Sequence, residues 1–521
     1  MSNPKKNFIY NIIYQVLILI IPLITAPYLA RVVGAEGVGT YSYTYSIVYY
    51  FMLFTLLGVN NYGNRSIAKV RDNKEELSKT FWGIYTLQLF LGIIMLLLYS
   101  IYILVFCNQY KNIATIQMLF IISAMIDINW FFFGMEEFKK TITRNTLIKV
   151  GNIVLILLLV KSKSDLWKYT LIMSGMTCLG QIVLWSFLRN KIKFVKVSFK
   201  DIIKHLKPNL VLFIPVIAVS LYKMMDKVML GMLTNVSEVG FYENAEKIVN
   251  IPMTFITALG TVMLPRISNI IAKGDREQVK KYINKSISFV MFLSFAMCFG
   301  LMSIGYNFAP IYFGSEFQKT GILIMMLSTT LPFLSFANVL RTQYLIPNEK
   351  DKIYITSVSL GAISNLLMNF IFIPKCYSIG ACIGTISAEA IVMIYQTLSV
   401  RRELPLGLYF KKVIPYFIKA FIMFIIIYPL NSIEINPMIR LLLQVIIGGI
   451  IYFFLNFKYI LSLININKIL SKLGLKRRKA VIFDDIDKNG EEDVIEINYI
   501  NEEENDYAII DNIVKNDEKN E

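Results

Sequence analysis

The strongest chemical signal in the sequence is a charged cluster inside an apolar segment. Lys223, Asp226 and Lys227 lie in LYKMMDKVMLG, three and four residues apart. In a helix this spacing predicts one shared face, with Ser220 one turn away. An ionisable group in a membrane span costs several kcal/mol and by default suggests function. The face carries a net positive charge and suits an anion; the alternative is a salt-bridged pair with one lysine snorkelling outward.

The next apolar segment begins with three more charged residues, Glu243, Glu246 and Lys247. They form either an interfacial pair or one wall of a cavity. Arg31, at the end of the first apolar segment, is either a cavity cation or an interfacial anchor. Phosphate groups are the obvious anions for such cations. We therefore predict a substrate cavity lined by Arg31, Lys223, Asp226, Lys227, Glu246 and Lys247.

Four further residues are candidates for parts of a transport cycle. Asp127 and Glu389 are carboxylates within apolar segments, which makes them candidate Na⁺ or H⁺ coupling sites. Arg65 and Arg266 fall at predicted cytoplasmic helix ends and could meet a charged head group first. The alternative for both arginines is the ordinary excess of positive charge on the cytoplasmic side.

The rare residues argue against enzymatic chemistry. The only histidine is His205, in a basic stretch that we interpret as a solvated loop, and metal clusters or catalytic triads need histidine. The five cysteines form no CxxC pair and read as small buried hydrophobic residues. Cys376 and Cys382 are weak evidence for a disulfide. We predict no catalytic residues, no cofactor and no nucleic-acid partner.

The composition places these residues in a bilayer. Of 521 residues, 55% are hydrophobic and 17% charged, whereas soluble domains carry roughly 25% charge. A membrane-spanning helix needs about 20 apolar residues. Fourteen segments meet this need, near 8–30, 40–60, 80–105, 112–134, 142–160, 166–188, 209–233, 243–265, 285–305, 318–340, 353–373, 380–400, 413–430 and 438–456.

The distribution of charge predicts the orientation. With the N-terminus inside, the cytoplasmic stretches up to residue 480 hold 38 Lys/Arg and the opposite stretches hold 8. This asymmetry predicts that both termini are cytoplasmic and that the protein is a multi-pass protein of the plasma membrane. Residues 481–521 hold 15 Asp/Glu and 3 Lys, so a basic membrane body carries an acidic tail.

The sequence also repeats itself at a distance of 201 residues. Nine identities occur in 37 ungapped positions, among them Gly39 with Gly240 and Tyr41 with Tyr242. The matched segments are six spans apart, which predicts parallel repeats about an axis along the membrane normal. We predict an all-α integral membrane protein divided into an N-lobe, a basic linker, a C-lobe, two added spans and a cytoplasmic tail, at 1–188, 189–208, 209–400, 401–460 and 461–521.

The tail holds one motif. Residues 485–496, DIDKNGEEDVIE, match the calcium-loop pattern D-x-[DN]-x-[DN]-G-x5-E. The oxygen ligands would come from Asp485, Asp487, Asn489, Asp493 and Glu496. Against calcium binding, the flanks are not clear amphipathic helices and no second loop follows. The alternative is a solvated acidic tail that folds back onto the basic loops.

Several stretches resemble the polysaccharide repeat-unit flippases, the polysaccharide transporter branch of the multidrug/oligosaccharidyl-lipid/polysaccharide exporter superfamily. They are YLARVVGAEGVGTYSYTYSIVYYF (28–51), NYGNRSIAKVRDN (61–73), DINWFFFGMEEF (127–138), DKVMLG (226–231), EVGFYENAEKIV (238–249), VMLPRIS (262–268) and RTQYLIPNEKDK (341–352). The resemblance covers about residues 5–460 and leaves out the acidic tail.

The resemblance implies fourteen helices, alternating access and a cationic cavity onto which Arg31, Lys223 and Lys227 map. Its cargo would be an oligosaccharide on undecaprenyl pyrophosphate, moved from the inner to the outer leaflet for surface polysaccharide synthesis. Its partners would be membrane lipids, a polysaccharide polymerase and glycosyltransferases of the same pathway. Three alternatives stay open: a multidrug exporter, a peptidoglycan-precursor flippase, and a membrane polysaccharide polymerase, although the large outside loop typical of polymerases is absent.

Overall fold

The computed structural model describes residues 4–189 and 191–463, so the predicted calcium loop at 485–496 lies outside the described residues. These residues are helical, and they contain no strand. The first half holds α1 (Pro4–Leu56), α2 (Val59–Val70), α3 (Lys74–Phe106), α4 (Lys111–Met125), α5 (Asn129–Gly134), α6 (Phe138–Leu159), η1 (Lys163–Asp165) and α7 (Leu166–Ser186). The remainder holds α8 (Phe199–Ile203), α9 (Leu206–Leu233), α10 (Val236–Ala272), α11 (Arg276–Phe313), η2 (Ser315–Phe317), α12 (Gln318–Ser328), α13 (Thr330–Leu340), η3 (Arg341–Leu345), α14 (Asp351–Cys376), α15 (Ser378–Val400), α16 (Leu406–Ile427), η4 (Tyr428–Ser432), α17 (Pro437–Leu455) and α18 (Phe457–Leu463).

The predicted all-helical membrane architecture is confirmed in its coarse form. Within the described residues, eleven helices are long and apolar enough to cross a membrane. Three differences separate this number from the fourteen predicted segments. α1 counts once, although Gly34 (φ 72°) interrupts its helical backbone and divides it into two stretches. α7 and α9 are long but are not among the eleven, and the polar residues Lys223, Asp226 and Lys227 fall within α9.

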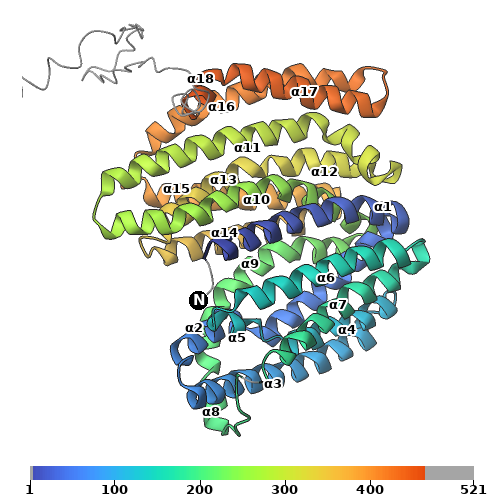
Figure 1. The fold of residues 1–521 in the computed structure, drawn as a ribbon. Helices are drawn as coiled ribbons and strands as arrows, with labels where there is room; N and C mark the ends of the chain where they lie inside the picture. Colours follow the sequence, from blue (N-terminus) through green and yellow to red (C-terminus); the bar gives the residue numbers. More distant parts are fainter. Residues whose placement is uncertain (1–3, 190, 464–521) are drawn as a thin grey trace, which may run out of the picture. The chain divides into compact units, whose positions relative to one another are not determined.

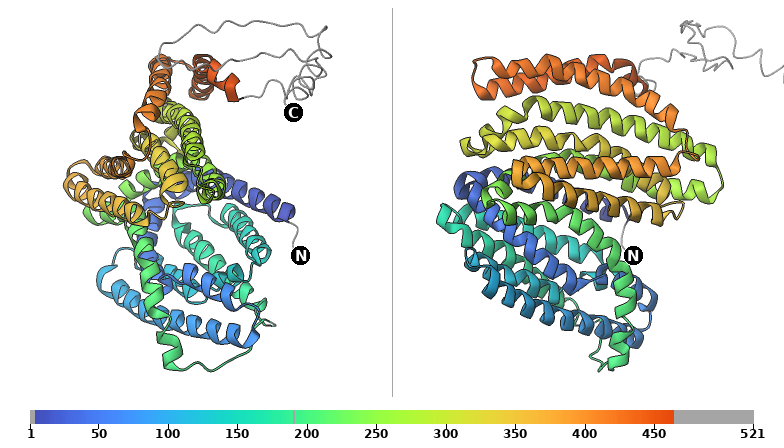
Figure 2. Two further views of the ribbon diagram at one scale, coloured as in Figure 1. Left: turned by 90° about the vertical axis from the view of Figure 1, so that its left-hand side faces the viewer. Right: turned by 180° about the vertical axis from the view of Figure 1, so that it is seen from behind.

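Residues 1–452 form one compact unit, and a second unit begins at Phe453. Within the first unit, α3, α4, α6 and α7 pack with α1, while α9 packs on α14 and α10 packs on α12. Figures 1 and 2 show α3, α4, α6 and α7 gathered apart from α11, α12, α13 and α15, with α1 and α9 between the two groups. α16 lies along α11. The division into two lobes stays a prediction, because the contacts join both halves into one unit.

The two halves meet most closely where α1 crosses α10, and both helices carry glycine there (Figure 1). A methyl group on Gly39 would lie 1.7 Å from the carbonyl oxygen of Val236. A methyl group on Gly240 would lie 2.1 Å from the carbonyl oxygen of Ala35. The two contacts are exchanged when 201 is added to or subtracted from each number. This symmetry supports the repeat that the sequence predicts.

The stretch that joins the halves is bound to the first half. The indole Nε1 of Trp82 donates to the carbonyl of Lys193 (3.0 Å), and the amide of Lys193 donates to Ser78 Oγ (3.0 Å). His205, predicted to be a solvated loop residue, is only 4% exposed. It lies against Gly83 of α3, and its Nδ1 is 2.7 Å from the hydroxyl of Tyr62 in α2. The prediction was wrong because the surrounding basic residues concealed a packing contact between helices.

All five cysteines are free. Cys107, Cys298 and Cys382 are buried, and Cys178 and Cys376 are half-buried. The interpretation of the cysteines as apolar packing residues is therefore confirmed for the three that are buried.

Candidate functional site

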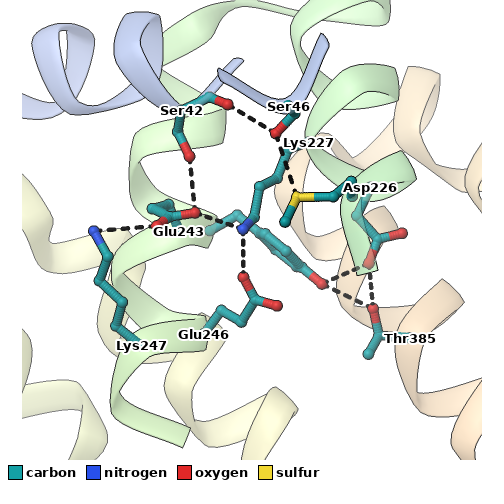
Figure 3. Close-up of polar contacts among 10 residues, drawn as sticks. Ser42, Ser46, Asp226, Lys227, Glu243, Glu246, Lys247 and Thr385 are labelled. Atoms are coloured by element: carbon teal, nitrogen blue, oxygen red, sulfur yellow. Dashed lines mark hydrogen bonds and ion pairs between the residues drawn. The ribbon is translucent and has the colours of Figure 1, made fainter. Parts of the chain in front are cut away.

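Lys227 is the centre of a buried ion-pair cluster between α9 and α10 (Figure 3). Its side chain is almost fully enclosed, and the residue is 7% exposed. The ammonium Nζ lies 2.6 Å from Glu243 Oε2 and 2.8 Å from Glu246 Oε2. A buried charge must be paired, because its desolvation penalty is several kcal/mol. Two carboxylates from successive turns of α10 provide that pairing for Lys227.

Glu243 connects this cluster to the first half of the chain. Its Oε1 lies 3.1 Å from Lys247 Nζ, and its Oε2 accepts a hydrogen bond of 2.8 Å from Ser42 Oγ of α1. Ser42 and Glu243 are 201 residues apart, so the bond joins two positions that match under the repeat. The sequence pointed to Glu243 as one of three charges opening a span but did not include it in the cavity. The repeat register was the signal that could have identified it.

Asp226 faces away from this cluster. One oxygen, Oδ2, accepts from the hydroxyls of Tyr242 (2.7 Å) and Thr385 (2.7 Å), and the other accepts from the Nδ2 of Asn369. The residue is 3% exposed. The predicted shared face for Lys223, Asp226 and Lys227 is therefore wrong. Neighbouring residues in a helix point about 100° apart. Asp226 therefore meets α14, α15 and Tyr242 of α10, whereas Lys227 meets the two glutamates of α10.

The cluster is not the net positive surface that the sequence predicted. Within the cluster, Lys227 and Lys247 pair with Glu243 and Glu246, so its charges balance. The other two predicted cavity cations lie apart from these bonds. Lys223 is exposed, and Arg31 is exposed and donates to the carbonyl of Ile311 (2.6 Å) at the end of α11.

The two predicted coupling carboxylates lie in different surroundings. Asp127 Oδ1 accepts from the amide nitrogen (2.8 Å) and the side-chain Nδ2 (2.7 Å) of Asn129, so it caps the turn before α5. Glu389, on α15, is 4% exposed and forms no ion pair or hydrogen bond within the described residues.

The two arginines proposed to meet a head group are both exposed. Arg65 belongs to α2, which is separated from α1 by a break after Leu56. Arg266 belongs to α10, which continues unbroken to Ala272, and its guanidinium donates to the hydroxyl of Tyr282 (2.6 Å). The matched positions therefore differ in local structure.

A pocket opens beside the ion-pair cluster, between α1, α7 and α10. Its apolar wall comes from α1 and consists of Ala26, Leu29, Val33 and Val38. Its polar wall consists of Tyr41, Ser42, Tyr169, Glu243, Asn244 and Lys247. Residues from both halves therefore form one pocket.

The arrangement allows binding, and it offers no catalytic group. Phosphate oxygens could replace the carboxylates on Lys227 and Lys247, because ammonium groups bind both kinds of oxygen. Within the residues that the structure describes, no group of three or more His, Cys, Asp or Glu could hold a metal ion.

Comparison with known proteins gives a consistent result. A family model described as "Polysaccharide biosynthesis protein" matches residues 5–271. Two relatives carry the name "Putative O-antigen transporter". The one from Escherichia coli (strain K12) is 25% identical over 406 residues, which is 77% of this chain and 97% of the relative. The one from Shigella dysenteriae is 24% identical over 404 residues, or 76% of this chain and 100% of the relative.

Two solved structures share the fold. One is "Lipid II flippase MurJ, inward closed conformation", with a TM-score of 0.70 and 17% identity, covering 87% of this chain and 98% of that chain. The other is an inward-facing multidrug resistance MATE family transporter of the MOP superfamily, with a TM-score of 0.56 and 13% identity, covering 74% and 97%. At these identities the likeness concerns the fold alone.

Proposed function

The chain belongs to the family of polysaccharide biosynthesis proteins, and from this premise we propose that it is a lipid-linked oligosaccharide flippase. Its cargo is an oligosaccharide repeat unit on undecaprenyl pyrophosphate, carried from the inner to the outer leaflet of the plasma membrane. The names of the two O-antigen transporter relatives support this cargo class, as does a fold shared with a lipid flippase.

The buried ion-pair cluster at Lys227 is the observation on which the mechanism rests. A lysine and two glutamates in adjacent helices are costly in a membrane, and an apolar replacement of similar volume would pack as well. We propose that these charges serve an exchange of partners. In the proposed cycle the pyrophosphate displaces Glu243 and Glu246 from Lys227, and the carboxylates return when the cargo leaves. The cluster thus prevents an empty carrier from holding an unpaired charge.

The proposed cycle is alternating access about the α1–α10 crossing. By the distribution of Lys and Arg, the crossing at Gly39 and Gly240 falls on the outer side and both termini are cytoplasmic. The tight crossing closes the outer end in this conformation. Opening it requires separating α1 from α10, and this breaks the bond between Ser42 and Glu243.

Coupling to a cation is proposed at one of the buried carboxylates. Glu389 is the better candidate of the two predicted from sequence, because Asp127 is bonded within its own turn. Polymerase and glycosyltransferases of the same pathway are the proposed partners.

The test is lipid analysis of cells depleted of this protein. Inside-out and right-side-out vesicles are extracted, and the undecaprenyl-linked glycans of each leaflet are identified by mass spectrometry. The proposal expects a multi-sugar repeat unit trapped on the cytoplasmic leaflet. Accumulated peptidoglycan precursor would identify the other lipid flippase instead. Unpolymerised units on the outer leaflet would identify a polymerase, and unchanged lipids would favour a drug exporter.

A further inference from the structure

Three tyrosines form a column on α1, next to Ser42, which bonds the ion-pair cluster. Tyr41, Tyr45 and Tyr49 are spaced four residues apart, which places them one above another on one helical face. The rings of Tyr41 and Tyr45 are nearly parallel, 5.8 Å between centroids and 8° between planes. The rings of Tyr45 and Tyr49 are 6.3 Å apart. All three side chains are half-buried, so part of each remains accessible.

Aromatic residues of α7 and α4 pack against the rings of the column. Tyr169 of α7 lies 4.6 Å from Tyr41, and Phe120 of α4 lies 5.1 Å from Tyr45, both measured between ring centroids. The second ring of each pair is buried or nearly so. The column is therefore a fixed platform, because its rotamers are set by packing against two other helices.

The hydroxyl groups of the column differ from those of several tyrosines that connect helices. Tyr28, Tyr99 and Tyr452 each donate to a backbone carbonyl of another helix or loop. The hydroxyls of Tyr41, Tyr45 and Tyr49 form no hydrogen bond within the described residues. A phenol that serves only packing could be replaced by phenylalanine, and a partly buried hydroxyl normally finds a partner. These three are available for a ligand.

The pocket described above begins at the Tyr41 end of the column. Asn244 lines it and is 1% exposed, yet neither its Oδ1 nor its Nδ2 has a hydrogen-bond partner among the described residues. An amide buried without partners costs about 1–3 kcal/mol, so a ligand that bonds it is the natural explanation. Ser42, Glu243 and Lys247 add donors and acceptors to the same pocket (Figure 3).

We propose that the tyrosine column and this pocket form the sugar-binding wall of the carrier. One face of a hexopyranose ring presents C–H groups, which pack on the negative face of an aromatic ring. Its hydroxyls at the rim both donate and accept, which matches Asn244, Ser42 and the phenol groups. Tyr45 is close enough to Lys227 for their side chains to interact electrostatically, so a sugar on the rings would place its attached phosphates near the lysine. In this proposal the aromatic rings of the first half bind the sugar, and the charged residues of the second half bind the phosphates.

This inference rests on the proposed function and deepens it, so its test uses two probes. The full chain is purified into lipid nanodiscs. Binding is measured for undecaprenyl pyrophosphate alone and for undecaprenyl pyrophosphate that carries one N-acetylhexosamine. Wild-type protein is expected to bind the glycosylated lipid about tenfold more tightly. Tyr45→Leu should remove this preference and leave binding of the bare lipid unchanged.

Three variants control for structural effects. Tyr45→Phe keeps the ring and should keep most of the preference. Tyr102→Leu removes a tyrosine that stacks on Tyr99 behind α1, and should not alter it. Asn244→Leu should weaken only the glycosylated probe.

The outcomes separate the two proposals. If wild-type protein binds both lipids equally, or if Tyr45→Leu keeps the preference, the sugar wall is overturned while the flippase survives. If Tyr45→Leu weakens both probes alike, the ring supports the fold and the sugar wall is likewise overturned. If wild-type protein binds neither lipid, the proposed function fails and the sugar wall fails with it.

Discussion

In the repeat, α1 matches α9 and α10 taken together, yet the matched side chains differ in chemistry. Where the second half carries charges, the first half carries small or aromatic residues. The matched pairs are Ala26 with Lys227, Ser42 with Glu243, Tyr45 with Glu246 and Ser46 with Lys247. At the crossing itself both helices keep glycine, at Gly39 and Gly240.

The difference indicates that the glycines at the crossing are fixed by the close approach of the two backbones, whereas the residues around them are set by the chemistry of the cargo. The crossing needs two residues without side chains, because a carbonyl oxygen occupies the place of each Cβ. The residues one turn away are free of that demand. They have diverged into phenol rings on one helix and ion pairs on the other, which suits a cargo with a sugar part and a phosphate part.

We expect the largest loss of stability and transport from substitutions at the two glycines of the α1–α10 crossing. Gly39→Ala and Gly240→Ala should each destabilise the protein by ~3 kcal/mol or more, because the added carbon meets backbone. Transport should fall to background in both. Thermal unfolding in detergent and a vesicle flipping assay measure the two effects. Gly300→Ala, where the added carbon meets nothing within 4 Å, is the matched control. Unequal effects at the two glycines would contradict the symmetric crossing.

We expect the next largest loss of stability and transport from substitution of Lys227 in the ion-pair cluster. Lys227→Gln leaves the half-buried Glu246 without a cation and Glu243 with Lys247 alone, and should cost ~3 kcal/mol of stability. Adding Glu243→Gln should recover part of that stability but none of the transport, because the phosphate-binding lysine is still missing. Lys223→Gln, on the exposed side of the same helix, is the control. A transport-competent double variant would reject the partner-exchange mechanism.

Loss of the hydrogen bond between Ser42 and Glu243, which joins the two halves, should have a moderate effect on the conformational equilibrium. Ser42→Ala removes the hydrogen bond to Glu243, and such bonds to charged groups contribute about 1.5–3 kcal/mol. Because this bond closes the crossing, its loss should shift the carrier toward the state in which α1 and α10 separate. Cysteine-accessibility labelling at Tyr41→Cys would report the shift as faster modification. Unchanged labelling would mean that the bond does not hold the crossing closed.

The smallest expected effect concerns the junction between the halves. Burial, together with Lys204, lowers the pKa of His205 to about 4 from its usual 6.5. The folded state therefore resists protonation, and stability is lost as the pH falls from about 6.5 toward about 4. A hydrogen bond from Ser198, with Lys204 and Lys79, lowers the pKa of Asp201, which titrates below this window.

Unfolding midpoints measured between pH 7.5 and 4 test this. His205→Gln should flatten the profile between pH 6.5 and 4, since glutamine does not titrate. Tyr62→Phe removes the hydroxyl beside Nδ1 but keeps the imidazole, so its profile should still slope. A flat wild-type profile would show that His205 is protonated without cost.

Much of the fold could be predicted from the sequence because its signals are local. Apolar segment length predicts membrane helices, and the 201-residue register predicts that Gly39 and Gly240 are equivalent. The break within α1 could not be located, because Gly34 is one of three glycines in VVGAEGVG and only backbone dihedrals identify it.

The site was predicted less completely because it depends on contacts between helices. Helical spacing alone grouped Asp226 with Lys227, whereas Asn369 and Thr385 on distant helices hold Asp226. The same limit hid the burial of His205, whose neighbours Tyr62 and Gly83 lie more than 100 positions earlier in the sequence. The sequence shows which residues are charged, whereas their partners and the balanced charge of the cluster could not be predicted from it.

The location of the charges bears on how the chain is made. α1 enters the membrane long before its partner, because about 200 further residues must be translated before Glu243 emerges. At about 5–20 residues per second this interval lasts about 10–40 s. Ser42 and the tyrosines of α1 are uncharged, so they can stay in the bilayer without a partner during this interval. Lys227, Glu243, Glu246 and Lys247 emerge within one helical hairpin, so each charge is inserted together with its counter-charge. Confining the cluster to α9 and α10 therefore spares the ribosome-bound intermediate an unpaired charge in lipid.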